Sequence, residues 1–167
     1  MKLKTIWIVC AVVAVGGLSI TLLPNLKNNT THLIYSSLEG ASAIVYKSPT
    51  CGCCEGHAKA MEKAGIEVKI VENIDLVSLK DEKHIPMDMQ SCHTTILSKD
   101  DAEYVVEGHV PIEGIVTLLE QQPNIDGIAL PGMPIGTPGM PGIKVAPYEI
   151  MTLDSSSNEA PKLYLSI

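Results

Sequence analysis

Three cysteines within four residues constrain this 167-residue chain more than any other feature of its sequence. Cys51, Cys53 and Cys54 follow a short apolar run at residues 43–46 and precede a helical pattern at residues 55–64. A cysteine loop between a strand and a helix lies at the positive end of the helix, which lowers the pKa of a thiol. Three thiolates in one turn concentrate negative charge, and a bound soft cation would balance that charge.

The cysteines could also serve roles other than binding a soft cation at the start of the helix. Cys92 is the fourth cysteine after residue 24, and four cysteines in an oxidising compartment can form two structural disulfides. That interpretation is disfavoured because the adjacent Cys53 and Cys54 point in diverging directions. A zinc site is a further alternative, although Cys-x-Cys-Cys is tighter than the usual zinc spacing. An oxidising location disfavours an iron–sulfur cluster.

The N-terminal residues form a separate segment. Lys2 and Lys4 precede an uncharged apolar run, Ile6 to Leu23. This pattern predicts a signal peptide or N-terminal membrane anchor over residues 1–24. The rest of the protein is therefore expected to be periplasmic or extracytoplasmic, and held at the inner membrane if the segment is retained. Residues 25–41 are polar and predict a tether.

The charge of the chain excludes nucleic acid as a partner. The 12 basic residues are all lysines, the acidic residues number 19, and the formal net charge is −7. Binding to phosphates needs a basic surface, and the bidentate fork of arginine is missing. Residues 1–24 hold two lysines and no acid, so ten lysines face 19 acidic residues in the remainder, for a net charge of −9. An acidic exported domain favours cations.

The order of strand and helix patterns predicts an α/β domain. The spacing of the first two strands around a helix is that of a βαβ crossover, so these strands are expected to be parallel. A hairpin and a second amphipathic helix follow, which gives the order β-α-β-(α)-β-β-α. In chain order the patterns lie at residues 43–46, 55–64, 66–70, 76–79, 91–97, 103–107 and 111–122.

The end of the chain has a different composition. The sequence Pro-Gly-Met-Pro occurs at residues 131–134 and again at residues 138–141. It is too rich in proline and glycine for a helix or strand and predicts a loop. The methionines of the repeat are interpreted as packing residues rather than as ligands of a soft metal ion. Residues 145–167 predict a C-terminal extension that forms a β-hairpin.

Four motifs in this chain resemble the thioredoxin-like copper-resistance proteins of the CopG type. They lie at residues 46–54, 91–94 and 107–111 and in the Pro-Gly-Met-Pro repeat, so the resemblance covers residues 43–142. It implies a thioredoxin-like metal-binding domain over residues 42–144. It also implies an exported protein that holds Cu(I) in its cysteine cluster, serves copper resistance and copper redox chemistry, and works with a copper or electron-transfer partner.

The resemblance also implies a set of copper ligands. In a thioredoxin-like topology the loop before the third strand lies beside the start of the first helix, and here that loop carries Cys92. The turn after the fourth strand lies at the same helix end and carries His109. His57 follows the cysteines by one helical turn. His93 is expected to point away, because successive side chains of a strand alternate between faces. The candidate ligands are Cys51, Cys53, Cys54, Cys92, His109 and His57.

A second function stays open at this point. Cys51 and Cys54 form a Cys-x-x-Cys pair at a strand-to-helix junction, which is the arrangement of thiol–disulfide oxidoreductases. Cys53 and Cys92 would then be resolving thiols. The sequence therefore leaves two kinds of enzyme open, a copper-dependent oxidoreductase and a thiol–disulfide oxidoreductase, beside a protein that only binds copper.

Overall fold

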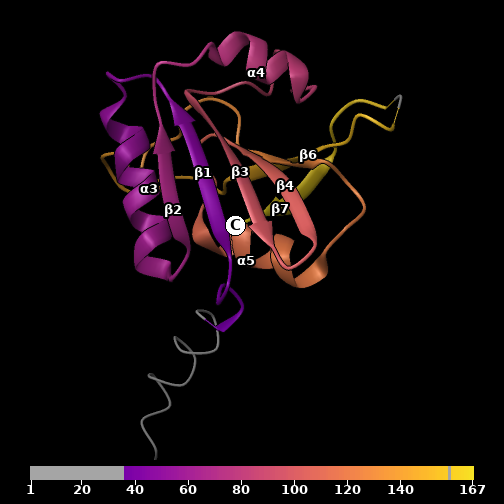
Figure 1. The fold of residues 1–167 in the computed structure, drawn as a ribbon, viewed down its shortest axis with the longest axis horizontal. Helices are drawn as coiled ribbons and strands as arrows, with labels where there is room; N and C mark the ends of the chain where they lie inside the picture. Colours follow the sequence, from indigo (N-terminus) through magenta and orange to yellow (C-terminus); the bar gives the residue numbers. More distant parts are fainter. Residues whose placement is uncertain (1–35, 158) are drawn as a thin grey trace, which may run out of the picture. The chain divides into compact units, whose positions relative to one another are not determined.

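Within residues 36–157 and 159–167, which the computed structural model describes, seven strands form one sheet (Figure 1). The strand order is β2-β1-β3-β4-β5-β6-β7. The strands are β1 Ser42–Lys47, β2 Glu67–Val71, β3 His93–Lys99, β4 Ala102–Glu107, β5 Gly127–Ala129, β6 Glu149–Leu153 and β7 Leu163–Ser166. Strands β1 and β2 are parallel, as predicted, and so are β4 and β5. The other neighbouring pairs are antiparallel.

Three helices of the described residues complete the fold, namely α3 Gly52–Ala64, α4 Leu76–Glu82 and α5 Ile112–Gln121. Helix α3 ends at Gly65, whose φ of 102° is the left-handed conformation expected of a glycine cap. The predicted α/β order is confirmed, and so is the C-terminal hairpin, formed by β6 and β7. Strand β5 was not predicted, because three residues are too few to show a period.

Helices α3 and α5 pack on one face of the sheet. Ala58 and Met61 of α3 and Ile115 and Leu118 of α5 belong to the main core. A smaller cluster covers the opposite face, where the segment that follows α4 lies over β3 and β4. Its buried residues are Ile85, Met89, Ile96, Val105, Ala129 and Leu153. The core holds both helices against the strands. The start of α3 is therefore fixed relative to the last residue of β1 and the first residue of β3.

The folded unit extends beyond residues 42–144 at both ends. Leu38 and Ala41, at the end of the predicted tether, are buried in the main core. Strand β6 pairs with β5, so the predicted C-terminal extension is part of the same sheet. The predicted signal peptide or anchor at residues 1–24 lies outside the described residues. Among the residues that are described, no helix has the length and apolar character needed to cross a membrane.

Candidate metal centre

The cysteine cluster lies where β1 ends and α3 begins. Cys51 precedes the first residue of α3, and Cys53 and Cys54 lie in its first turn. Cys51 and Cys54 form a disulfide, whereas Cys53 and Cys92 are free thiols. The four cysteines of the described chain therefore form one disulfide in this structure, not the two structural disulfides that their number allows.

Cys92 lies against the start of α3, although it is 38 residues away from Cys54 in the chain. The Sγ atoms of Cys54 and Cys92 are 3.5 Å apart, and those of Cys51 and Cys53 are also 3.5 Å apart. All four sulfur atoms lie within 4.8 Å of one another. The structure thus brings together the cysteines of two distant segments at one helix end.

Two histidines extend this cluster on the side of Cys92. The Sγ atom of Cys92 is 3.2 Å from Nε2 of His109 and 3.4 Å from Nδ1 of His93. Cys54, Cys92, His93 and His109 form a second group of donor atoms within 4.8 Å of one another. The expectation that His93 points away from Cys92 is wrong. Cys92 precedes the first residue of β3, so the alternation of a regular strand does not apply to this pair.

His57 lies behind His93 rather than among these donor groups. Both of its ring nitrogens already have partners in the protein. Nδ1 is 2.9 Å from Nε2 of His93, and Nε2 is 2.8 Å from the carbonyl oxygen of Val110. The side chain is fully buried. The structure therefore places His57 beside His93 with both ring nitrogens engaged, and outside the two groups of donor atoms.

The hydrogen bonds assign the tautomers of the three rings. A carbonyl oxygen only accepts, so Nε2 of His57 donates to Val110 and Nδ1 of His57 accepts from Nε2 of His93. Nδ1 of His93 then has a lone pair that faces Cys92. In the same way, Nδ1 of His109 donates to the carbonyl oxygen of Pro138 over 2.9 Å, which leaves a lone pair on Nε2. Both nitrogens that face Cys92 are in the form that binds metal ions.

Burial keeps these rings neutral. Desolvation is the largest cause that lowers the pKa of His57 to about 4 and that of His93 to about 2, and it also lowers the pKa of His109. Burial raises the pKa of the Cys92 thiol to about 11, and the neighbouring Cys53 contributes to the increase. In the metal-free protein Cys92 is therefore a thiol at neutral pH, and a metal ion has to displace its proton.

Lys47 does not supply free positive charge to this cluster. Lys47 is the last residue of β1, and its side chain is buried. Its Nζ atom lies 2.6 Å from a carboxylate oxygen of Glu72 and 3.4 Å from a carboxylate oxygen of Glu55. The two carboxylates raise the pKa of Lys47, with the hydrogen bond to Glu72 as the largest cause. The positive charge of this lysine is already compensated. A cluster of thiolates would need its counter-charge from a bound ion.

Comparisons with known proteins identify relatives of this chain. Residues 89–140 match a family described as a protein of unknown function, DUF411. Two solved structures named "Copper resistance protein copG", Form 1 and Form 2, are similar to this chain with a TM-score of 0.67 and 32% sequence identity. The matches cover 77% of this chain and 98% and 99% of the solved chains. The chain belongs to the CopG copper-resistance family. No curated protein sequence matches it.

Membership of the CopG family confirms the resemblance that the motifs indicate. The matched segment 89–140 contains Cys92, His93 and His109 together with the first of the two Pro-Gly-Met-Pro sequences and nearly all of the second. It begins after the Cys-x-Cys-Cys group. The structural matches cover nearly all of the two solved CopG chains.

The Pro-Gly-Met-Pro loop of this CopG family member lies against the cysteine cluster. Gly139 meets the backbone of α3, and a Cβ atom there would clash with the carbonyl oxygen of Cys53 and lie 2.6 Å from the amide nitrogen of His57. Its φ is +86°. Met133 is 54% exposed, so it is not a packing residue as interpreted from the sequence. The loop contacts the cluster through backbone atoms and through Pro138.

Substitution Gly139→Ala is expected to destabilise the protein by about 1–3 kcal/mol, because the new methyl group is strained in the left-handed region and has no space. Urea unfolding of the metal-free protein measures this loss. Gly132→Ala is the matched control, since Gly132 also has a positive φ, +73°, but no atom lies within 4 Å of the position that its new methyl group would take. Equal losses in the two variants would show that the close contact with α3 has no energetic role.

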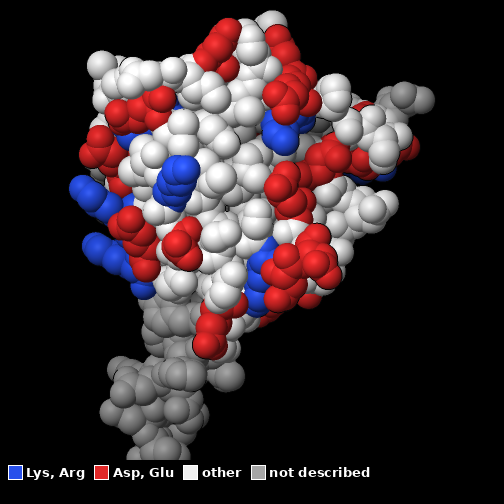
Figure 2. Space-filling model, viewed as in Figure 1, with Lys and Arg blue, Asp and Glu red and all other residues white. Residues whose placement is uncertain are grey.

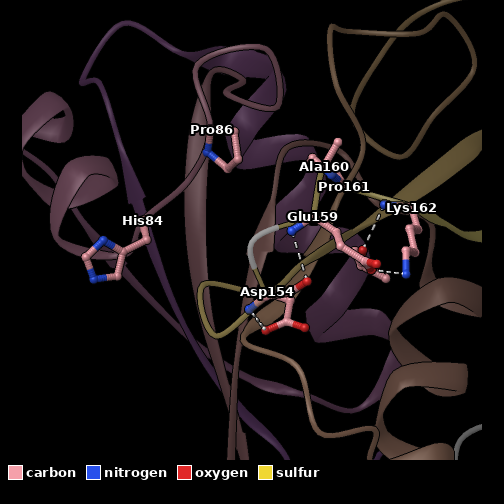
Figure 3. Close-up of a pocket in the computed structure, with 9 residues that line it drawn as sticks. His84, Pro86, Asp154, Glu159, Ala160, Pro161 and Lys162 are labelled. Atoms are coloured by element: carbon pink, nitrogen blue, oxygen red, sulfur yellow. Dashed lines mark hydrogen bonds and ion pairs between the residues drawn. The ribbon is translucent and has the colours of Figure 1, made fainter.

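A polar pocket lies apart from the candidate metal centre, and none of its described lining residues belongs to either donor group. It lies between residues 84–86 and the connection of β6 to β7, and none of the cysteines lines it (Figure 3). Asp154 accepts hydrogen bonds from the backbone amides of Ser156 and Ser157. Glu159 forms an ion pair with Lys162. The acidic groups of this pocket are thus engaged within their own turn.

Proposed function

We propose that this protein binds Cu(I) in its Cys/His cluster and serves copper resistance. The observation that carries the proposal is the overlap of the two donor groups. One group is formed by the four cysteines and the other by Cys54, Cys92, His93 and His109, so both contain Cys54 and Cys92. The names of the two solved CopG structures, which refer to copper resistance, support the same metal.

The donor atoms suit a soft ion. Thiolates suit soft ions such as Cu(I) and also zinc, and neutral imidazole nitrogen is a good ligand of both metals, so the choice of copper rests on the CopG names. The lone pairs of His93 and His109 already face Cys92 before a metal ion binds, so little reorganisation is needed on that side. Thiolate sulfur bridges metal ions readily, and the two shared cysteines support a site with more than one copper ion.

The disulfide sets a condition on this function. Cys51 and Cys54 are bonded to each other, and a disulfide sulfur is a poor metal ligand compared with a thiolate. Reduction takes up two electrons and two protons and gives two thiols, which then lose their protons to the solvent when copper binds. The complete cluster is therefore available only in the reduced protein.

The same disulfide supports a second candidate function. The Sγ atom of the free Cys92 lies 3.5 Å from the Sγ atom of Cys54, which is bonded to Cys51. A thiol in this place is positioned for thiol–disulfide exchange at the start of α3. A thiol–disulfide oxidoreductase that uses Cys51 and Cys54 is thus the alternative. Disulfide exchange by the metal-free protein separates the two candidates.

We further propose that the protein acts outside the cytoplasm, because residues 1–24 have the pattern of a signal peptide or membrane anchor. Its partners would be copper ions and a copper or electron-transfer protein. Asp and Glu side chains, with lysines among them, lie around the face shown in Figure 2, whose centre holds few charged groups. The net charge of −7 agrees with a cationic ligand and disfavours nucleic acid.

Anaerobic titration with Cu(I) tests the copper proposal. The reduced protein is expected to show thiolate-to-copper absorption and to bind Cu(I) tightly in a fixed ratio. The oxidised protein, with the Cys51–Cys54 disulfide intact, is expected to bind fewer ions and more weakly, because Cys53 and Cys92 are then the only thiols left among the four cysteines of the cluster. Absence of tight binding by the reduced protein would refute the proposal.

A further inference from the structure

Helix α4 is attached to the sheet in an unusual way. Of its residues Leu76–Glu82, all of which the structure describes, only Lys80 is buried. Val77 of the same helix is 68% exposed. A helix that packs on a sheet normally buries an apolar stripe. The buried lysine must therefore have a polar partner, since an unpaired buried charge is very unfavourable.

That partner is Glu107 at the end of β4, which is itself fully buried. Its carboxylate receives three donors from three segments of the chain. Lys80 Nζ forms an ion pair with Oε1, and the hydroxyl of Thr94 on β3 donates to Oε2 over 2.7 Å. The backbone amide of Ser91 donates to Oε1 over 2.6 Å. Lys80 also donates to Thr94 over 3.0 Å.

The bond to Ser91 connects this network to the candidate metal centre. Ser91 immediately precedes Cys92, and its hydroxyl donates to the carbonyl oxygen of Gly132 over 2.8 Å. After Cys92, the carbonyl oxygen of His93 accepts from the amide of Gly108 over 3.1 Å. Gly108 has a φ of +78°, and a Cβ atom there would lie 2.8 Å from the Ser91 side chain. Residues 107 and 108 thus hold the backbone on both sides of Cys92.

We propose that Glu107 is a positioning residue for Cys92 and that Lys80 is its charge partner. The inference rests on the proposed copper site. The carboxylate fixes the Ser91 amide, and with it the backbone from which the Cys92 sulfur reaches Cys54, His93 and His109. Lys80 compensates the charge of Glu107, so the carboxylate holds the loop without adding net negative charge beside the thiolates.

Stability alone does not explain a buried ion pair at this place. Replacing such a pair with apolar side chains of similar volume is often neutral or stabilising. What an apolar pair cannot do is accept the hydrogen bond of the Ser91 amide, which would then lose its partner. The ion pair is therefore suited to holding a particular backbone group, the amide of Ser91, which lies next to Cys92, one of the two cysteines shared by both donor groups.

The double variant K80M/E107L tests this role, because it removes the acceptor of the Ser91 amide and leaves no unpaired charge. The matched control is K83M/E103L, which removes the pair of the half-buried Lys83, next to the same helix, and the exposed Glu103, on the same strand, 4.0 Å apart. Three measurements are made on both: urea unfolding, the alkylation rates of Cys92 and Cys53 in the reduced metal-free protein, and Cu(I) affinity by competition.

We expect K80M/E107L to remain folded, to show severalfold faster alkylation of Cys92 with Cys53 unchanged, and to bind Cu(I) about 10- to 100-fold more weakly, as is typical when a ligand loses its supporting contact. The control should match the wild type in all three. Wild-type alkylation and affinity in the double variant would overturn the inference and leave the copper proposal intact. If the wild type itself binds no Cu(I), the copper proposal fails, and the alkylation rates alone decide the role of Glu107.

A variant with a smaller change covers the case in which the double variant does not fold. Thr94→Val removes one hydrogen bond to the same carboxylate and keeps the ion pair. It is expected to accelerate alkylation of Cys92 in the same direction and by a smaller factor. An unchanged rate in folded Thr94→Val would contradict the inference.

Discussion

Replacing Cys92 with serine is expected to abolish tight Cu(I) binding by the reduced protein. Cys92 belongs to both donor groups, and its Sγ atom contacts Cys54, His93 and His109. A serine hydroxyl is a hard donor that Cu(I) does not favour. The loss should exceed the roughly 100-fold upper range for removal of a supporting contact, because a direct ligand is removed. Anaerobic competition with a chromophoric Cu(I) chelator measures it.

Cys53→Ser is the matched control for this experiment. Cys53 is also a free thiol at the cluster, but it belongs only to the group of four cysteines. The second donor group remains complete in this variant, so a smaller loss of affinity is expected. Equal affinities of Cys92→Ser and wild type, in protein with an unchanged urea midpoint, would show that Cys92 is not a ligand. Equal losses in the two serine variants would contradict the two-group arrangement.

The sequence predicts the framework of the fold because its strands and helices have clear periods. The alternation in β2 and the cap at Gly65 mark a crossover, and the structure confirms the parallel pairing of β1 with β2. The meeting of Cys92 with the Cys-x-Cys-Cys group follows from topology rather than from local pattern. It could be anticipated only after the motifs indicated a thioredoxin-like arrangement.

Other parts of the site depend on contacts that no local pattern reveals. His93 is a candidate ligand because Cys92 precedes β3 and the alternation rule starts one residue later. His57 has the spacing of a ligand, but its ring is taken up by His93 and Val110. Lys80 and Glu107 look like surface charges in the sequence, since charged residues are rarely buried unless they are paired. Their pairing joins residues 27 positions apart.

Mild acid is expected to destabilise the metal-free protein by about 2 kcal/mol for each of His57 and His93 between pH 7 and pH 5. Burial lowers the pKa of these rings to about 4 and about 2, whereas both titrate near 6.5 when unfolded. Below pH 6.5 the unfolded state therefore binds more protons than the folded state, and the free energy of unfolding decreases as the pH is lowered. The contribution of His57 is lost between about pH 6.5 and pH 4, and that of His93 continues to fall below pH 4.

The losses from the two rings should add, because between pH 7 and pH 5 the protons are taken up by the unfolded state, in which the two rings titrate independently. His109, whose pKa is also lowered by burial, acts in the same direction. The carboxyl groups of Asp75 and Asp154 do not contribute in this window, because their lowered pKa values lie below 3.8.

Urea unfolding free energies at pH 7, 6 and 5 measure the slope. His57→Gln should flatten it, whereas His84→Gln, at an exposed site, should leave it unchanged. A wild-type slope near zero would mean that His57 and His93 have the same pKa in the folded and unfolded states, and it would contradict the lowered pKa values of the buried rings.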